Sequence, residues 1–383
     1  MPLLPALAVV LPLLLAAQTI EEQEWHLDAL DVYSAQDQSR GDGVIVAVID
    51  SGVDATHPDL AGRVLPGTGF GSSKGTDGTT DVDGHGTGMA GIIAANSRNG
   101  GALGIAPGAK ILPIASADEK EQFALDVVAE SIRWASDHGA KVINMSLGFS
   151  SSMTPSLVKA VNYAIEKDIV LVAATGNEGK EVSAPANIAG VIAVAGTNRE
   201  GKPWKSSNVG TDTVLAAPAV SIVTTAPESV YSSGYAEMDG TSAASAIVSG
   251  VAALVRAKHP QMPAKDVVNA LIKTAQDLAD PGRDEATGFG MVNPMGALTA
   301  QFPPVARNPL LPEPKPSTTQ PTPTLAAQQP VQPVVEMKDR LPFVAGVAGG
   351  TALMTGLLIA LPAIRSRRRE PVVSARDTPP TPW

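Results

Sequence analysis

Short apolar runs rich in β-branched residues alternate with helical stretches between residues 25 and 300. Five runs predict strands that are buried on both faces, at 44–49, 111–115, 142–147, 169–174 and 191–195. Five stretches predict helices, near 87–96, 123–138, 155–167, 243–258 and 264–275. Because strands and helices alternate, we predict an α/β domain, a doubly wound parallel sheet with helices on both faces. In such sheets functional side chains gather beyond the carboxyl ends of the strands.

The two ends of the chain have different patterns. Residues 1–17 are apolar, short and broken by proline, which predicts a signal peptide, with a buried core segment as the alternative. Residues 18–24 are then a short extension before the domain. Residues 301–340 contain ten prolines and predict an extended linker. Residues 341–364 carry no charged side chain and predict one transmembrane helix, and the arginines of 365–383 predict a cytoplasmic tail.

Composition and charge narrow the classes of function. Apolar residues make up 44% of the chain, enough for a large core. There is no cysteine, which excludes disulfides, thiolate metal sites and a thiol nucleophile. The formal net charge of −10 disfavours a nucleic-acid partner.

Four polar residues stand at strand ends or helix starts. Asp50 ends the first predicted strand, and Asn177 follows the fourth. His85 lies in an Asp-Gly-His-Gly-Thr sequence before a predicted helix, and Ser242 precedes the buried helix 243–258. Each has an ordinary interpretation on its own, as a turn residue, a loop residue or a helix cap. Together they supply one reaction, which is acyl transfer by an activated serine.

That reaction sets clear chemical requirements. A serine hydroxyl is a weak nucleophile, so an imidazole must take its proton and a carboxylate must orient the imidazole. His85 and Asp50 are the candidates for these roles. Asn177 would donate a side-chain N–H to the oxyanion, beside the backbone N–H of Ser242.

The same residues resemble the signature segments of the subtilisin-like serine proteases. The matching segments are 46–54, 57–60, 85–91, 104–107, 143–148, 174–179 and 240–242. The resemblance implies a subtilisin-like fold and a polypeptide substrate. It also implies a catalytic triad of Asp50, His85 and Ser242, with Asn177 as the oxyanion donor.

Further roles follow from the same resemblance. Ser146, Leu147 and Gly148 are implied as the strand edge that pairs with an extended substrate and lines its specificity pocket. Ala246 stands where the family usually has proline. The turn 94–107 resembles a calcium-binding loop of many relatives, but it carries Arg98, whose guanidinium would take the place of the ion. We therefore predict no cofactor and no metal site, with a structural calcium ion in this turn as the alternative.

The order of segments resembles the mycosins, membrane-anchored proteases of actinobacterial type VII secretion. It implies a single-pass membrane protein whose 25–300 protease domain is extracytoplasmic and cuts exported proteins. The alternative is a scaffold that stabilises a secretion complex, with catalysis secondary or lost. Ala246 and the very short extension at 18–24 leave that alternative open.

Overall fold

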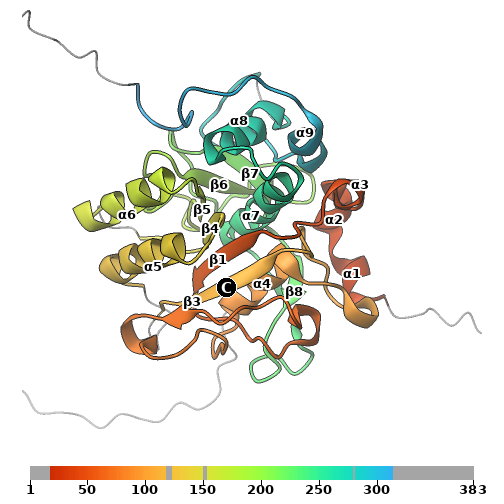
Figure 1. Cartoon of the computed structure of the whole chain (residues 1–383). Coiled ribbons are helices and arrows are strands. Elements are labelled where there is room, and N and C mark those ends of the chain that lie inside the picture. The colour runs from red at the N-terminus through yellow and green to blue at the C-terminus, as the bar shows by residue number, and fades with distance from the viewer. Residues whose placement is uncertain (1–17, 118–122, 150–152, 279–280, 314–383) are drawn as a thin grey trace, which may run out of the picture. The chain divides into compact units, whose positions relative to one another are not determined.

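A computed structural model describes residues 18–313, apart from 118–122, 150–152 and 279–280 (Figure 1). The predicted signal peptide, membrane helix and tail lie outside the described residues, as does most of the predicted linker. Among the residues that are described, no helix is both long and apolar enough to cross a membrane.

A seven-stranded sheet in the order β2-β3-β1-β4-β5-β6-β7 forms the centre of the domain, and every neighbouring pair in it is parallel. The strands are β1 Ile45–Asp50, β2 Thr68–Gly69, β3 Lys110–Ala115, β4 Val142–Met145, β5 Val170–Ala174, β6 Ile192–Thr197 and β7 Leu215–Pro218. An antiparallel hairpin, β8 Ile222–Thr225 with β9 Tyr235–Met238, lies outside this sheet. The strands β1 and β3 to β7 are buried almost throughout. For β1 and β3 to β6 this burial agrees with the continuous apolar runs in the sequence.

Helices cover both faces of the sheet, which confirms the predicted α/β class. The longer ones are α4 His85–Ala94, α5 Leu125–Asp137, α6 Pro155–Glu166, α7 Thr241–Lys258 and α8 Ala264–Thr274. The shorter ones are α1 Ile20–Gln23, α2 Trp25–Ala29, α3 Val32–Gln38 and α9 Pro294–Thr299. Helices α4 and α7 pack together on one face, and α5 and α6 pack together on the other (Figure 1).

The helix α7 is buried along almost its entire length, from Thr241 to Arg256. Its small residues let it lie close to the strands, and it contacts β4, β5, β6 and β7. At Gly250 a β-carbon would come within 2.6 Å of Ile105. This close packing fixes the start of α7 relative to the carboxyl ends of the strands.

The order of strands reverses at β1, which has β3 on one side and β4 on the other. Such a reversal separates the loops that follow neighbouring strands and opens a crevice at their carboxyl ends. Asp50 is the last residue of β1 and therefore lies at the edge of this crevice.

Residues 301–313, within the predicted linker, lie against the domain rather than apart from it. The backbone N–H of Val305 donates to Asp266 (2.7 Å), and the Nζ of Lys265 donates to the carbonyl of Ala306 (3.3 Å). Leu310 packs against the hydrophobic core. The domain and linker limits predicted from the sequence stay predictions.

Candidate active site

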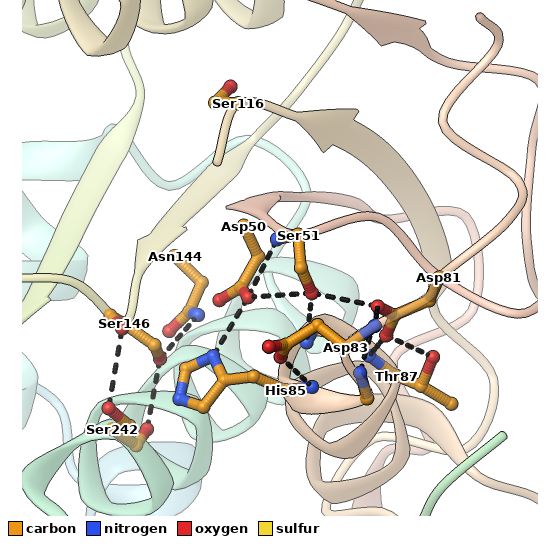
Figure 2. A network of polar contacts seen from close by, with 12 residues as sticks. Asp50, Ser51, Asp81, Asp83, His85, Thr87, Ser116, Asn144, Ser146 and Ser242 are labelled. Atoms are coloured by element: carbon orange, nitrogen blue, oxygen red, sulfur yellow. Dashed lines mark hydrogen bonds and ion pairs between the residues drawn. The ribbon is translucent and has the colours of Figure 1, made fainter. Parts of the chain in front are cut away.

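The position of His85 depends on two glycines that flank it. Gly84 precedes α4 with a φ of 110°, a left-handed conformation that glycine adopts without strain. At Gly86 a β-carbon would lie 2.0 Å from the carbonyl oxygen of Gly52, so only glycine lets the helix approach the end of β1 this closely. His85 thus becomes the first residue of α4. Its Nδ1 lies 2.8 Å from Oδ1 of Asp50 (Figure 2).

Asp50 is buried, and its Oδ1 is held by further hydrogen bonds. Only 1% of its surface is exposed, and the backbone N–H of Ser51 donates to the same Oδ1 (2.8 Å). The hydroxyl of Ser51 in turn accepts from the backbone N–H of Gly86 (3.0 Å) and donates to Oδ1 of Asp81 (2.9 Å). The end of β1, which carries Asp50, and the helix α4, which carries His85, are therefore joined through the hydroxyl of Ser51.

Asp81 is a centre of this network that the sequence did not reveal (Figure 2). Its buried carboxylate accepts from the backbone N–H of Gly84 (2.9 Å) and from both the N–H (2.9 Å) and the hydroxyl (2.6 Å) of Thr87. Asp83 accepts from the N–H of His85 (2.9 Å). The repeated aspartates before Gly-His-Gly-Thr were the available signal, but their partners become visible only in the folded loop.

The electrostatics of His85 follow from these neighbours. Burial by itself lowers the pKa of an imidazole, because it disfavours the charged form. The carboxylate of Asp50, with smaller contributions from Asp83 and Asp81, outweighs burial and raises the pKa of His85 above its ordinary value. The site therefore stabilises the imidazolium that forms when His85 takes a proton.

Ser242 is the second residue of α7, so its N–H belongs to the first turn, where backbone donors have no partner within the helix. Its hydroxyl donates to the carbonyl of Ser146 (3.3 Å). In Figure 2 the His85 ring lies between Asp50 and Ser242. The three side chains and Asn177 line one cavity of about 200 Å³.

The side chain of Asn177 is oriented by Thr241, a second residue that the sequence did not reveal. The backbone N–H and the hydroxyl of Thr241 both donate to Oδ1 of Asn177, each at 2.9 Å. Because its oxygen is occupied in this way, Asn177 has its NH₂ group left to offer to an oxyanion. The Thr241 hydroxyl also accepts from the N–H of Gly176 (3.1 Å).

The predicted substrate edge lies beside the same cavity. Ser146, Leu147 and Gly148 follow β4 and line a larger pocket of about 660 Å³, which also reaches Asn177 and Ser242. An extended chain lying along this edge would place a side chain in the pocket and its carbonyl near Ser242. The assignment of these three residues to substrate binding stays a prediction.

The loop 94–107 is held by a carboxylate. The two oxygens of the fully buried Asp59 accept from the backbone N–H groups of Arg98 and Ala102, both at 2.9 Å, and from the hydroxyl of Tyr235 (2.8 Å). Arg98 is exposed, and its contact with Asp59 is made by the backbone N–H. Among the described residues, no group of three or more acidic or histidine side chains is placed to hold a metal ion.

A carboxylate, an imidazole, a serine at a helix start and an oriented amide share one cavity. Acyl transfer by serine requires these parts, and they define a protein of the serine-hydrolase class. Comparison with known families narrows the class. Residues 41–290 match the subtilase family, Peptidase S8, and the chain belongs to that family.

Individual relatives agree with this assignment. The chain is 36% identical to subtilisin BL of Lederbergia lenta over 271 residues, which are 70% of this chain and 96% of the relative. The solved structure of the MycP3 protease from the type VII (ESX-3) secretion system matches with a TM-score of 0.65 and 32% identity, over 72% of this chain and 88% of the other. MycP1 without its N-terminal propeptide matches with a TM-score of 0.62 and 30% identity, over 73% and 98%. The predicted subtilisin-like serine endopeptidase, similar to the mycosins, is confirmed.

Proposed function

We propose that this protein is a membrane-anchored serine endopeptidase that cleaves exported polypeptides outside the cytoplasm in association with a type VII secretion system. The single observation that carries the catalytic part is the 2.8 Å contact between His85 and Asp50 in a cavity that also contains Ser242. The similarity to the MycP3 protease supports the link to secretion. The uncharged residues 341–364, followed by arginines, support the anchor.

The cavity supports a two-step hydrolysis. His85 takes the hydroxyl proton of Ser242 as its oxygen attacks the scissile carbonyl, and the side-chain amide of Asn177 and the N–H of Ser242 stabilise the oxyanion. The C–N bond then breaks, and His85 gives the proton to the leaving amine. In the second step His85 takes a proton from water as the water attacks the acyl-enzyme, and it gives that proton to the Ser242 oxygen as the ester bond breaks and the second product leaves. Each proton has a donor or acceptor in the chain, so we infer that the reaction needs no cofactor.

A fluorophosphonate probe tests the chemistry on the full chain in membranes. We expect it to label the wild-type protein and not Ser242→Ala. Ser249→Ala is a matched control, because Ser249 lies on the same helix without touching the nucleophile, and it should be labelled. A folded wild-type protein that remains unlabelled would remove the peptidase proposal.

A scaffold role gives a different outcome in cells. In a strain that lacks the protein, the wild type should restore both secretion and cleavage of the exported substrate. If secretion requires the peptidase activity of the protein, Ser242→Ala restores neither secretion nor cleavage. Restored secretion without cleavage would assign the protein a structural role beside its chemistry.

Membrane anchoring has its own test. We expect the full chain to stay with membranes after alkaline extraction and a chain that ends at residue 340 to be released. Release of the full chain would refute the anchor and leave the catalytic proposal intact.

A further inference from the structure

Buried hydroxyl and amide groups connect the nucleophile to the end of β4. The carbonyl of Ser242 accepts from the hydroxyl of Ser146 (3.0 Å) and from that of Ser245 (2.9 Å). These two hydroxyls are also 2.8 Å apart. Asn144 donates to the Ser146 hydroxyl (2.9 Å) and accepts from that of Ser249 (3.0 Å). Each of these five residues is at least nine-tenths buried.

Ser245 occupies a special place in this network, because it contacts both sides of the active site. Ser146 belongs to the predicted substrate edge, and its carbonyl accepts a hydrogen bond from the hydroxyl of Ser242 (3.3 Å). Three contacts join the hydroxyls of Ser146 and Ser245 and the carbonyl of Ser242. Because each hydroxyl has one proton to donate, two of the three contacts can be hydrogen bonds at any one time. Whichever way these protons point, the two hydroxyls and the carbonyl remain connected.

We propose that Ser245 is a positioning residue for the peptidase reaction, which fixes the first turn of α7 against the end of β4. The distance between these two elements sets where the Ser242 hydroxyl lies relative to a carbonyl held on the substrate edge. Small errors in such a distance reduce the rate of attack much more than they reduce binding. Ser245 acts through Ser146 and Ser242 and does not touch the substrate itself.

The network also has a structural connection with Ala246. A proline at this position would lack the N–H that an α-helix directs at the carbonyl four residues earlier, which is that of Ser242. Ala246 retains this donor, and α7 runs without a break from Thr241 to Lys258. Side-chain donors from Ser146 and Ser245 then hold the same carbonyl from the side of the sheet.

The test compares Ser245→Ala with Ser249→Ala in the full chain. Both variants remove one buried hydroxyl from the same helix and the same network, but within the described part of the chain the Ser249 hydroxyl bonds only to Asn144. We expect Ser245→Ala to lower kcat and the rate of fluorophosphonate labelling about fivefold, with KM within about twofold of the wild type. Ser249→Ala should keep kcat within about twofold of the wild type. It should lower the midpoint of unfolding by about as much as Ser245→Ala does.

Equal values of kcat in the two variants, or a wild-type rate in Ser245→Ala, would overturn the proposal. If Ser245→Ala folds poorly, titration with the fluorophosphonate gives the folded fraction and corrects kcat. Ser245→Cys retains a weak donor of similar size, so its kcat should fall between those of wild type and Ser245→Ala, and a lower value counts against the proposal. The inference rests on the serine-peptidase chemistry alone. A wild-type protein that is never labelled refutes that chemistry, whereas labelling of Ser245→Ala at the wild-type rate refutes only the role of Ser245.

Discussion

His26 and His85 are both enclosed by the same domain, yet their pKa values move in opposite directions. His26 lies in α2 with none of its surface exposed, and neither ring nitrogen has a hydrogen-bond partner among the described residues. Burial lowers its pKa to about 3. His85 experiences burial too, but Asp50 at 2.8 Å raises its pKa. A charged partner, rather than burial, decides which form of the imidazole the fold stabilises.

Two buried carboxyl groups, Asp59 and Glu24, differ in their hydrogen-bond partners. Asp59 is fully buried and accepts three hydrogen bonds from the protein. Glu24 is also buried, and one of its oxygens accepts from the N–H of Leu103 (2.8 Å), but the other has no partner among the described residues. Burial raises the pKa of Glu24 to about 9, aided by Glu21 and Asp59. The N-terminal segment therefore contains two side chains, Glu24 and His26, that are neutral when folded, whereas the active site stabilises the charged form of His85.

The largest expected effect comes from breaking the Asp50 to His85 pair. Asp50→Asn keeps the shape of the side chain but removes the charge and favours the wrong tautomer of His85. We expect kcat to fall about 10⁴-fold with little change in KM. Without the carboxylate, the pKa of His85 should move downward, as it does for His26. Hydrolysis of a peptide substrate measures the rate, and NMR titration of the ring measures the pKa.

Asp54→Asn is the control for this change. Asp54 lies on the same loop, and its carboxylate accepts from the N–H (2.9 Å) and hydroxyl (2.6 Å) of Thr56 rather than from His85. Its kcat should stay near that of wild type. A loss in Asp50→Asn no greater than in Asp54→Asn would show that the carboxylate is not part of the reaction.

The next effect is on stability in acid. The folded state holds His26 neutral down to a pKa of about 3, whereas the unfolded chain binds a proton near 6.5. Stability contributed by neutral His26 is therefore present above pH 6.5 and lost as the pH falls, by up to about 1.4 kcal/mol per pH unit. His26→Leu removes this titration. We expect urea unfolding between about pH 4 and 7 to show a smaller loss of stability in the variant.

His138→Gln serves as the comparison, because it removes an exposed histidine, whose ring stacks on Trp134, and leaves His26 in place. The pH profile of His26→Leu would contradict the assignment if it ran parallel to that of wild type. Such a result would mean that His26 gains a partner or water in acid before the domain unfolds.

Glu24→Gln should act on the opposite side of the pH scale. The folded state keeps Glu24 protonated up to about pH 9, whereas the unfolded chain loses the proton near 4.5. Wild-type stability from this group therefore declines as the pH rises between these values. Glutamine keeps an acceptor for Leu103 and does not ionise. We expect the variant to be about 1 kcal/mol or more stable than wild type at alkaline pH and nearly equal at acid pH.

The control for Glu24→Gln is Glu22→Gln, because Glu22 is on the same helical segment but exposed, with its carboxylate bonded to the N–H of Thr19. Equal alkaline gains in the two variants would show that the general loss of negative charge, rather than burial of Glu24, causes the effect.

Much of the fold could be predicted because it rests on continuous apolar runs. Strands such as Val170–Ala174 and helices such as Ala264–Thr274 lie within two residues of the predicted limits. The strand Leu215–Pro218 and the hairpin β8–β9 were not predicted, because they are four residues long and carry proline, threonine or glutamate instead of an apolar run. The short N-terminal helices were missed for a related reason, since tertiary contacts rather than length stabilise them.

The residues of the candidate site also fall into two groups, those that the sequence predicts and those that only the structure shows. Asp50, His85, Asn177 and Ser242 stand out because they interrupt apolar runs at strand ends and helix starts. Their supporting residues do not, because Asp81 and its partners meet only when a loop folds. Ser245 is seen from the sequence merely as one more small residue of a buried helix, and its contact with Ser146 spans 99 residues.

The smallest expected effect is that of calcium on thermal stability. It tests whether the hydrogen bonds that Asp59 accepts from the protein exclude an ion from the loop 94–107. Its carboxylate already accepts two backbone N–H groups and a phenol hydroxyl, so an ion would have to displace these donors. We therefore expect the same thermal midpoint with millimolar calcium as with a chelator. Tyr235→Phe removes one of the three donors, and its midpoint should fall in both conditions by a similar amount. A rise in the wild-type midpoint with calcium would show that the loop 94–107 binds the ion, and that the hydrogen bonds of Asp59 are exchanged for it.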